Sequence, residues 1–300
     1  MNSSKNAGQN AGLNRRDLLR WTAAGGLCAA LAPSLLRAAE PKVTIPAYNT
    51  LSIEEEIALG RKFGAAFEQQ VTMVRLPLVD TYLSGIVSKL AKASQQPNWP
   101  FEIKVVNLAA INACAIPGGL LYVNRGLLEF VENENEMVGC IAHEIGHVVA
   151  RHTTNQLSRL FIARQLYERV KENVLKNNEV VTKIIETLGG PLVMLAQLHY
   201  SREAESEADL LGFYEMMRAG WNPKGLLDFF TSLQKVQRQQ TAVDVMLSDH
   251  PATAERAKVM EHELATVNIT VPLREQSVQF QALKGALRLL PPAPAPQKKQ

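Results

Sequence analysis

The chain has 300 residues, of which 46% are hydrophobic and 20% are charged, so it can bury a full core as one or two domains and is not a disordered, collagen-like or polytopic membrane protein. Its formal net charge is +3, but five cations and one anion lie in the first 38 residues, which leaves 27 cations and 28 anions in the remainder. That remainder has no block of lysine and arginine interleaved with aromatic residues, which excludes a nucleic-acid-binding role.

The N-terminal segment has the layout of an export signal. Arg15 and Arg16 precede a moderately apolar stretch, residues 21–36, and small residues for cleavage follow near Ala38. Paired arginines before a weakly hydrophobic segment resemble a twin-arginine signal. The apolar stretch is shorter than the ~20 residues that span a bilayer, so an uncleaved anchor is the less favoured alternative. We expect a periplasmic protein, exported by the twin-arginine pathway, and leave open whether the signal is cleaved.

Hydrophobic periodicity predicts a chain dominated by helices. A capping box begins the first helix at Ser52, and a second helical pattern runs over residues 78–90. Alternating apolar residues at 101–105, and an apolar run at 120–123 after a Pro-Gly-Gly turn, predict a small sheet of hairpins. From Asn133 onward almost every pattern is helical. We therefore expect an α+β fold that is mostly α-helical.

These patterns divide the chain into four parts. Residues 1–38 form the export signal, and residues 39–51 form a linker. Residues 52–270 form one domain. Residues 271–300 form a C-terminal extension whose end, from Pro291, is too rich in proline and polar residues to pack and is expected to be disordered.

His143, Glu144 and His147 form the motif that carries chemistry. Residues four apart on a helix project from nearly the same side, so both imidazoles can bind one metal ion. Glu144 lies beside them and can deprotonate a metal-bound water, which is the base that peptide hydrolysis requires. The alternative is a pair of solvated histidines on a helix face.

A third metal ligand must come from elsewhere in the chain, because catalytic zinc has three protein ligands and an open position for water. Glu205 is the best candidate, on a helix that we expect to begin at Pro191. Asp209 lies four residues further on the same face, where its carboxylate can accept the second N–H of a ligating imidazole. Glu203 and Glu207 point elsewhere and are expected to form a solvated acidic face.

These motifs carry a family resemblance. The sequence from His143 to His152, followed by Ser201-Arg202-x-x-Glu205-x-x-x-Asp209, resembles the gluzincin peptidase family of the CAAX prenyl protease and the HtpX heat-shock peptidase. Within that family the chain is most similar to soluble periplasmic members of the BepA and LoiP kind, over about residues 50 to 265. The resemblance implies a zincin-type metallopeptidase domain at 52–270, with a small sheet whose edge strand faces the active-site helix.

The resemblance also assigns roles to individual residues. It implies one zinc ion per chain, held by His143, His147 and Glu205, with Glu144 as the base and Asp209 supporting a ligand.

Further roles follow from the same resemblance. Arg256 lies close to the ligands, and His250 approaches the metal, either as a donor to the oxyanion, the role we favour, or as a fourth ligand that keeps the enzyme latent. An extended substrate is implied along the edge strand formed by Asn112, Ala113, Cys114, Ala115 and Ile116.

Three other residues near the motif have structural interpretations. His152, five positions after His147, is expected to point away from the zinc face and to be a structural hydrogen-bonding residue rather than a fourth ligand. Cys114 and Cys140 alone remain in the mature chain, so a disulfide between them is permitted but not required. Cys140 is also the residue that could close a purely structural zinc site, the least favoured interpretation.

The function expected from these observations is a zinc endopeptidase that cleaves unfolded or misassembled envelope proteins. The alternative is a chaperone-like periplasmic binder of unfolded chains with little proteolysis, against which Glu144 argues, since a binder has no need of a general base. The partners expected are unfolded or misfolded proteins, with peripheral association with envelope assembly machinery allowed. We expect no nucleic acid and no membrane span in the mature chain. The physiological substrate, the cleavage preference and the oligomeric state stay open.

Overall fold

The computed structural model describes residues 42–43, 49–169, 200–239, 250, 254–269 and 277–295. The export signal predicted for residues 1–38 and the helix start predicted at Pro191 lie outside these ranges.

The described residues form an α+β fold that is mostly helical, which confirms the predicted fold class. The helices are α2 (Ile53–Glu68), α3 (Pro77–Ala93), α4 (Arg125–Phe130), α5 (Glu134–Val149), α6 (His152–Arg169), α9 (Arg202–Ala219), α10 (Lys224–Gln239), α11 (Ala254–Thr266) and α12 (Val278–Arg288). The strands are β1 (Met73–Val74), β2 (Glu102–Val106), β3 (Ala113–Ile116) and β4 (Leu120–Asn124), with one 3-10 turn, η1 (Pro117–Gly119), between β3 and β4. Among these helices, none has the length and apolar character to cross a membrane.

Two of the helices begin at side-chain caps, and the first of these caps is predicted by the sequence. Ser52 and Glu55 form the expected capping box, in which each side chain accepts a hydrogen bond from the backbone N–H of the other residue. At the start of α5, Asn133 Oδ1 accepts a hydrogen bond from the N–H of Glu136 at 3.0 Å. All residues of α5 are buried, so this helix runs through the core rather than exposing one face.

The sheet has four strands in the order β1-β2-β4-β3. Strands β3 and β4 form the expected antiparallel hairpin around the Pro-Gly-Gly turn, but β2 and β4 are parallel. The prediction of a sheet made only of hairpins is therefore wrong. After β2 the chain passes to the outer edge, forms β3 there, and returns beside β2 as β4, so the parallel pairing follows from the order of the strands.

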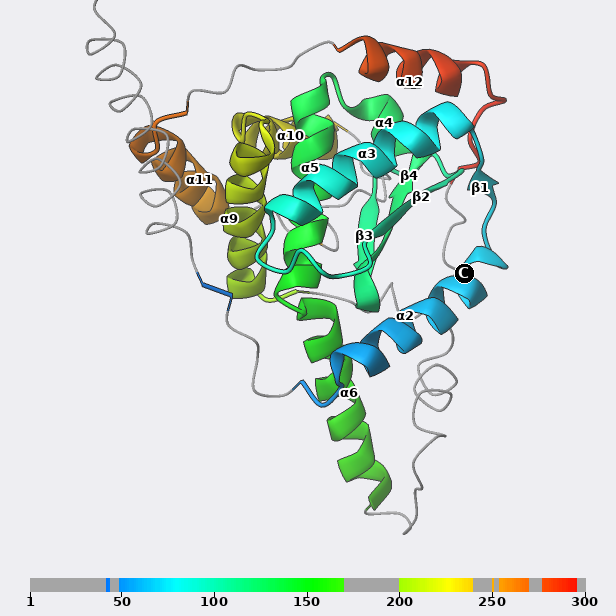
Figure 1. Cartoon of the computed structure of the whole chain (residues 1–300), viewed down its shortest axis with the longest axis vertical. Helices are drawn as coiled ribbons and strands as arrows, with labels where there is room; N and C mark the ends of the chain where they lie inside the picture. Colours follow the sequence, from blue (N-terminus) through cyan, green and yellow to red (C-terminus); the bar gives the residue numbers. More distant parts are fainter. Residues whose placement is uncertain are drawn as a thin grey trace, which may run out of the picture. The chain divides into compact units, whose positions relative to one another are not determined.

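Helix α5 lies between the sheet and the later helices (Figure 1). It contacts β3 on one side and packs against α9 and α10 on the other. Helix α3 contacts β2 and α9, and α2 lies near the turn between β3 and β4. Strand β3 is the edge strand nearest to α5, as the predicted fold class requires.

The helix that carries Glu205 begins later than the sequence suggested. Helix α9 starts at Arg202, and Ser201 caps it by accepting a hydrogen bond from the N–H of Ala204 at 3.2 Å. Tyr200 precedes the cap and is not helical. Glu205 is thus in the first turn of its helix and not in the interior of a helix begun at Pro191.

Helices α4 and α12 cap each other. Arg125, in α4, donates to the carbonyl of Leu287 in α12 at 3.0 Å, and Lys284, in α12, donates to the carbonyl of Val131 after α4 at 2.7 Å. Each cation thus satisfies carbonyl groups near the C-terminal end of the other helix. Three apolar side chains of α12 are fully buried, namely Phe280, Leu283 and Leu287.

The first part of the proline-rich tail is in contact with the domain. The carbonyl of Pro291 accepts a hydrogen bond from Arg125, and the carbonyl of Pro294 accepts one from the N–H of Ala109 at 2.9 Å. Residues 296–300 of the tail lie outside the described residues.

Candidate metal centre

Helices α5 and α9 approach until their backbones touch. A Cβ atom on Gly146 of α5 would lie 2.7 Å from the carbonyl oxygen of Ala208, and a Cβ on Gly212 of α9 would lie 3.0 Å from the carbonyl carbon of Ala142. Only glycine allows this approach, because any side chain would collide with the backbone of the other helix. The contact sets the first turns of α9 beside the motif on α5.

The three predicted ligand side chains converge at this contact. His143 Nε2 and His147 Nε2 lie 3.0 Å apart, and Glu205 places one oxygen 3.5 Å from His143 Nε2 and the other 3.4 Å from His147 Nε2. Tetrahedral zinc with bonds of about 2.0–2.2 Å holds its ligand atoms roughly 3.4 Å apart. The donor types and their separations therefore fit a zinc ion.

His250 joins the same group. Its Nδ1 lies 3.2 Å from His143 Nε2 and 2.9 Å from a carboxylate oxygen of Glu205. One ligand atom from each of the four residues lies within 4.8 Å of the others, and all four side chains are buried. His250 thus stands where a fourth ligand would stand, which is the position that a catalytic zinc leaves open to water.

Glu144 lies beside this group and is only 2% exposed. One of its carboxylate oxygens is 3.6 Å from His250 Nε2. Burial raises the pKa of the Glu144 carboxyl, because desolvation disfavours the charged form. A carboxylate with a raised pKa is a better proton acceptor, as expected of a base.

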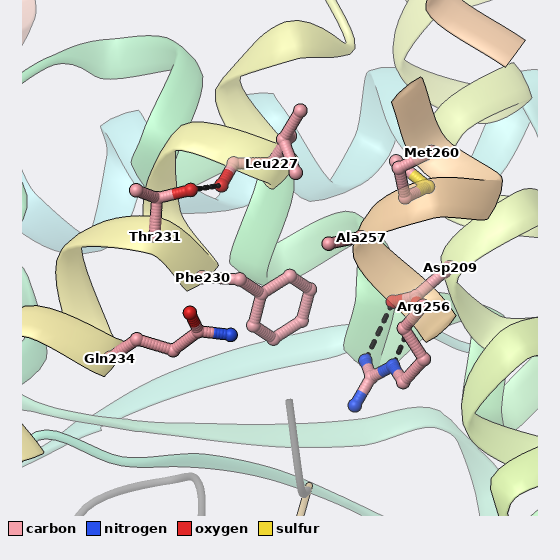
Figure 2. Close-up of a pocket in the computed structure, with 8 residues that line it drawn as sticks. All are labelled: Asp209, Leu227, Phe230, Thr231, Gln234, Arg256, Ala257 and Met260. Atoms are coloured by element: carbon pink, nitrogen blue, oxygen red, sulfur yellow. Dashed lines mark hydrogen bonds and ion pairs between the residues drawn. The ribbon is translucent and has the colours of Figure 1, made fainter. Parts of the chain in front are cut away.

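Asp209 and Arg256 support the ligands from the side of α9 and α11. Asp209 Oδ1 lies 2.9 Å from His143 Nδ1, so it accepts the N–H of the imidazole whose other nitrogen faces the ligand group. Arg256 donates to both oxygens of Asp209, at 2.7 and 2.8 Å, and its third nitrogen is 2.7 Å from Glu205. Figure 2 shows the guanidinium of Arg256 turned toward the Asp209 carboxylate.

Neighbouring polar and charged groups shift the pKa values of Glu205 and His143. Burial alone would raise the pKa of Glu205, but His250, His143 and His147 outweigh burial and hold that pKa well below its ordinary range. Burial lowers the pKa of His143, whereas its hydrogen bonds to Asp209 and Glu205 raise it, with a net value of about 9. Glu205 is thus held as a carboxylate, the form that binds a metal.

A small cavity of about 30 Å³ lies against the Asp209–Arg256 pair, between α9, α10 and α11 (Figure 2). The ring of Phe230, which lines this cavity, also forms a T-shaped contact with the ring of His143, with 5.6 Å between the ring centroids. The lining residues are Asp209, Leu227, Phe230, Thr231, Gln234, Arg256, Ala257 and Met260.

His152 is a hydrogen-bonding residue and is not in the ligand group, as predicted. Its position is different from the one expected, because its ring faces His147, with 3.0 Å between the two Nδ1 atoms. Its Nε2 lies 3.1 Å from a carboxylate oxygen of Glu207. The prediction that Glu207 belongs to a solvated acidic face is therefore wrong, whereas Glu203 is exposed, as expected.

Tyr200 is part of the site and was missed by sequence analysis. Its ring stacks on that of His147, with 4.0 Å between centroids, and its hydroxyl lies 2.8 Å from the Thr153 hydroxyl. Burial raises the pKa of the Tyr200 hydroxyl well above its ordinary value. The only signal in the sequence is its place just before the Ser201 cap, which does not by itself predict contact with a ligand on another helix.

In the predicted substrate strand, Asn112 to Ile116, the backbone groups point alternately toward β4 and away from it. The carbonyl of Asn112 accepts from the N–H of Asn124, which follows from pairing with β4. The carbonyl of Ala115 accepts instead from Thr153 Oγ1, at 3.3 Å, on the side away from β4. Because backbone groups alternate along a strand, Ala113 also directs its N–H and C=O away from β4.

Cys114 and Cys140 do not form a disulfide. Cys114 is half-buried in β3, and Cys140 is fully buried in α5, where burial raises the pKa of its thiol. Cys140 is not a member of the ligand group, whose fourth residue is His250.

Sequence comparison shows which known proteins this chain is similar to. The sequence matches the model of Peptidase family M48 over residues 77–264. It is 27% identical over 223 residues to the beta-barrel assembly-enhancing protease of Yersinia pestis, covering 70% of this chain and 44% of that protein. It is 30% identical over 160 residues to the mitochondrial metalloendopeptidase OMA1 of Arabidopsis thaliana, covering 53% of this chain and 31% of that protein. It is 27% identical over 183 residues to the metalloprotease YcaL of Escherichia coli, covering 60% of this chain and 69% of that protein.

The matches cover different shares of the relatives and of this chain. The chain spans less than half the length of the beta-barrel assembly-enhancing proteases that it matches. The family model, in contrast, covers more than half of the chain and includes the motif on α5 and the distal glutamate on α9. The predicted gluzincin resemblance is confirmed, and the chain belongs to Peptidase family M48.

Proposed function

We propose that the chain is a zinc-dependent endopeptidase that hydrolyses peptide bonds of unfolded or misassembled envelope proteins. The observation that carries the proposal is the convergence of His143, His147 and Glu205 at separations of 3.0 to 3.5 Å, which suit tetrahedral zinc. The buried carboxylate of Glu144 beside them supports hydrolysis rather than a structural role.

In this proposal each residue has a distinct task. A zinc ion held by the three ligands would supply Lewis acidity to the scissile carbonyl and to the attacking water. Glu144 takes the proton from that water and passes it to the leaving amine. Asp209 and Arg256 keep the His143 ring and the Glu205 carboxylate in place through the hydrogen bonds and ion pair between them.

We propose that the substrate binds as an extended strand along β3. Ala113 is the residue whose N–H and C=O are directed away from β4, so a substrate strand can pair with it by β-augmentation. The carbonyl of Ala115 is already bonded to Thr153. The interaction therefore centres on Ala113 and not on the whole of residues 112–116.

His250 has two candidate roles, which differ in where its ring must be. As a donor to the oxyanion it would stand beside the zinc, and as a fourth ligand it would occupy the position of water. Its distance of 2.9 Å from Glu205 supports the second arrangement for the conformation described. In the second arrangement His250 would have to give up its place for water to bind at a four-coordinate zinc.

The substrate class and the compartment belong to the same proposal. The name of the relative from Yersinia pestis connects that protein with β-barrel assembly. On that ground, and from the twin-arginine-type signal in residues 1–38, we place the chain in the periplasm. There it would act on misassembled envelope proteins and could associate peripherally with the machinery that assembles them.

Casein degradation by the purified protein tests the proposal, with added zinc, with a chelator, and with Glu144→Gln. We expect the zinc-loaded wild type to be active and Glu144→Gln to be inactive, because the amide keeps the shape of Glu144 but cannot accept the proton. Glu144→Gln should keep its fold and one bound zinc ion. Glu203→Gln is the matched control, since Glu203 is an exposed glutamate on α9, and it should cleave casein normally. Cleavage by Glu144→Gln at nearly the wild-type rate would refute the mechanism, and protection of unfolded casein without cleavage by the wild type would favour the chaperone-like alternative.

A further inference from the structure

The ring of His147 is held on the side opposite the ligand group by a second histidine. His147 Nδ1 lies 3.0 Å from His152 Nδ1, and His152 Nε2 lies 3.1 Å from a carboxylate oxygen of Glu207. The side chain of His152 is 5% exposed and that of Glu207 is 24% exposed, so the chain of contacts runs from the buried centre toward the surface.

The position of His152 depends on a break in the helix. In a continuous helix, a residue five positions after His147 would point to a different side. Arg151 has a left-handed φ of 55°, which ends α5 and starts α6 in a new direction at His152. Arg151 donates from Nε to Glu56 and from Nη2 to the carbonyl of Leu51, both at 2.7 Å, and these contacts hold the uncommon conformation.

Metal binding by His147 determines which ring nitrogens carry a proton in this chain of contacts. If His147 binds zinc through Nε2, its remaining proton is on Nδ1, and it donates to His152. His152 must then accept at Nδ1 and carry its own proton on Nε2, which it donates to Glu207. Every hydrogen bond has one donor and one acceptor in this arrangement, and no other assignment with neutral rings allows His147 to bind through Nε2.

Ring stacking on His147 cannot replace these hydrogen bonds. The ring of Tyr200 lies against the face of His147 and restricts its tilt, with 29° between the two planes. A stacked ring neither selects the proton position on His147 nor fixes rotation within the ring plane. Both are fixed by a hydrogen bond to Nδ1, as Asp209 provides one for His143.

We propose that His152 and Glu207 are positioning residues that orient His147 for zinc binding, with Glu207 acting through His152. This inference rests on the proposed zinc site and assigns to the second histidine ligand a support that is separate from Asp209 and Arg256. It gives Glu207, which precedes Asp209 by two residues on α9, a role in metal affinity.

Zinc affinity of the full chain tests the inference, measured by competition with a chromophoric chelator. Glu207→Ala and His152→Ala should each bind zinc about 10- to 100-fold more weakly than the wild type, as expected when a partner of a ligating histidine is lost. Glu207→Gln should lose less affinity than Glu207→Ala, because an amide oxygen can still accept from His152. Glu203→Ala, the exposed control on the same helix, should bind as the wild type does.

A double-mutant cycle separates this role from a structural one. Because Glu207 acts through His152, the double alanine variant should bind zinc no more weakly than His152→Ala alone. The visible spectrum of the cobalt-substituted protein should change in Glu207→Ala, and the melting temperature of its metal-free form should stay near that of Glu203→Ala.

Two different results would overturn two different proposals. If the wild type binds no zinc at this site, the proposed function fails. If the wild type binds zinc and Glu207→Ala binds it equally well, or if the two single losses simply multiply in the double variant, only the present inference fails.

Discussion

Gly146→Ala is expected to force α5 and α9 apart and to weaken the metal centre without removing any ligand. The added Cβ would lie 2.7 Å from the carbonyl oxygen of Ala208 and 3.0 Å from its Cα, where ordinary contacts begin at 3.4 Å. Both atoms belong to helix backbone, so no flexible side chain can move aside. The helices must separate by roughly 0.7 Å, the difference between these contacts.

The size of the effect follows from packing and from helix propensity. Overpacking a close contact costs about 1–3 kcal/mol. Gly85→Ala is the matched control, because Gly85 is in helix α3, is exposed, and has nothing within 4 Å of its built Cβ. That substitution should stabilise the protein by about 0.5–1 kcal/mol through helix propensity alone. For Gly146→Ala the same gain offsets part of the overpacking cost, so a net loss of ~1 kcal/mol lowers its melting temperature by about 2–4 °C.

Two measurements on the metal-free proteins check this prediction, namely thermal unfolding by circular dichroism and zinc affinity by chelator competition. Separation of α9 from α5 moves Glu205 away from His143 and His147, so the affinity should fall together with the melting temperature. If Gly146→Ala is as stable as Gly85→Ala and binds zinc as the wild type does, the close approach of the two helices does not set the ligand geometry.

Three further substitutions test single residues of the site. Asp209→Ala should weaken zinc binding about 10- to 100-fold, because His143 loses the acceptor for its Nδ1–H; a titration identical to that of the wild type would exclude this role. His250→Ala should raise the cleavage rate at saturating peptide while zinc content is unchanged, because it empties the fourth corner of the ligand group; a lower rate would instead assign the donor role. Ala113→Pro should slow cleavage of an extended peptide without loss of zinc, because proline removes the outward N–H; normal turnover by the folded variant would rule out pairing along β3.

The local parts of the site could be predicted from the sequence. The spacing of His143 and His147 places them on one side of any helix, and the need for a third ligand pointed to Glu205 with Asp209 one turn later. The capping box at Ser52 and the overall helical class followed from patterns within single elements. These predictions depend only on geometry within one helix.

Features that depend on the path of the backbone could not be predicted. The parallel pairing of β2 with β4 results from where the chain places β3, and no residue in the strands specifies it. The contact of His152 with His147 depends on the left-handed φ of Arg151. Such a conformation is uncommon for residues other than glycine, so an arginine in the sequence does not predict it. The place of Tyr200 on the ring of His147 likewise comes from packing between distant segments.

The reciprocal capping of α4 and α12 means that the unit that folds is larger than the unit that defines the family. The match to Peptidase family M48 ends at residue 264, whereas the core continues to Leu287. A chain ended at residue 264 would lose the three buried apolar side chains of α12, each worth about 1.5–3 kcal/mol, and would leave the carbonyl of Val131 without its lysine. Since a whole domain is stable by only about 5–15 kcal/mol, a catalytic region cut at the family boundary would be poised to unfold. The residues that keep this protein folded therefore include a segment that supplies no side chain to the ligand group.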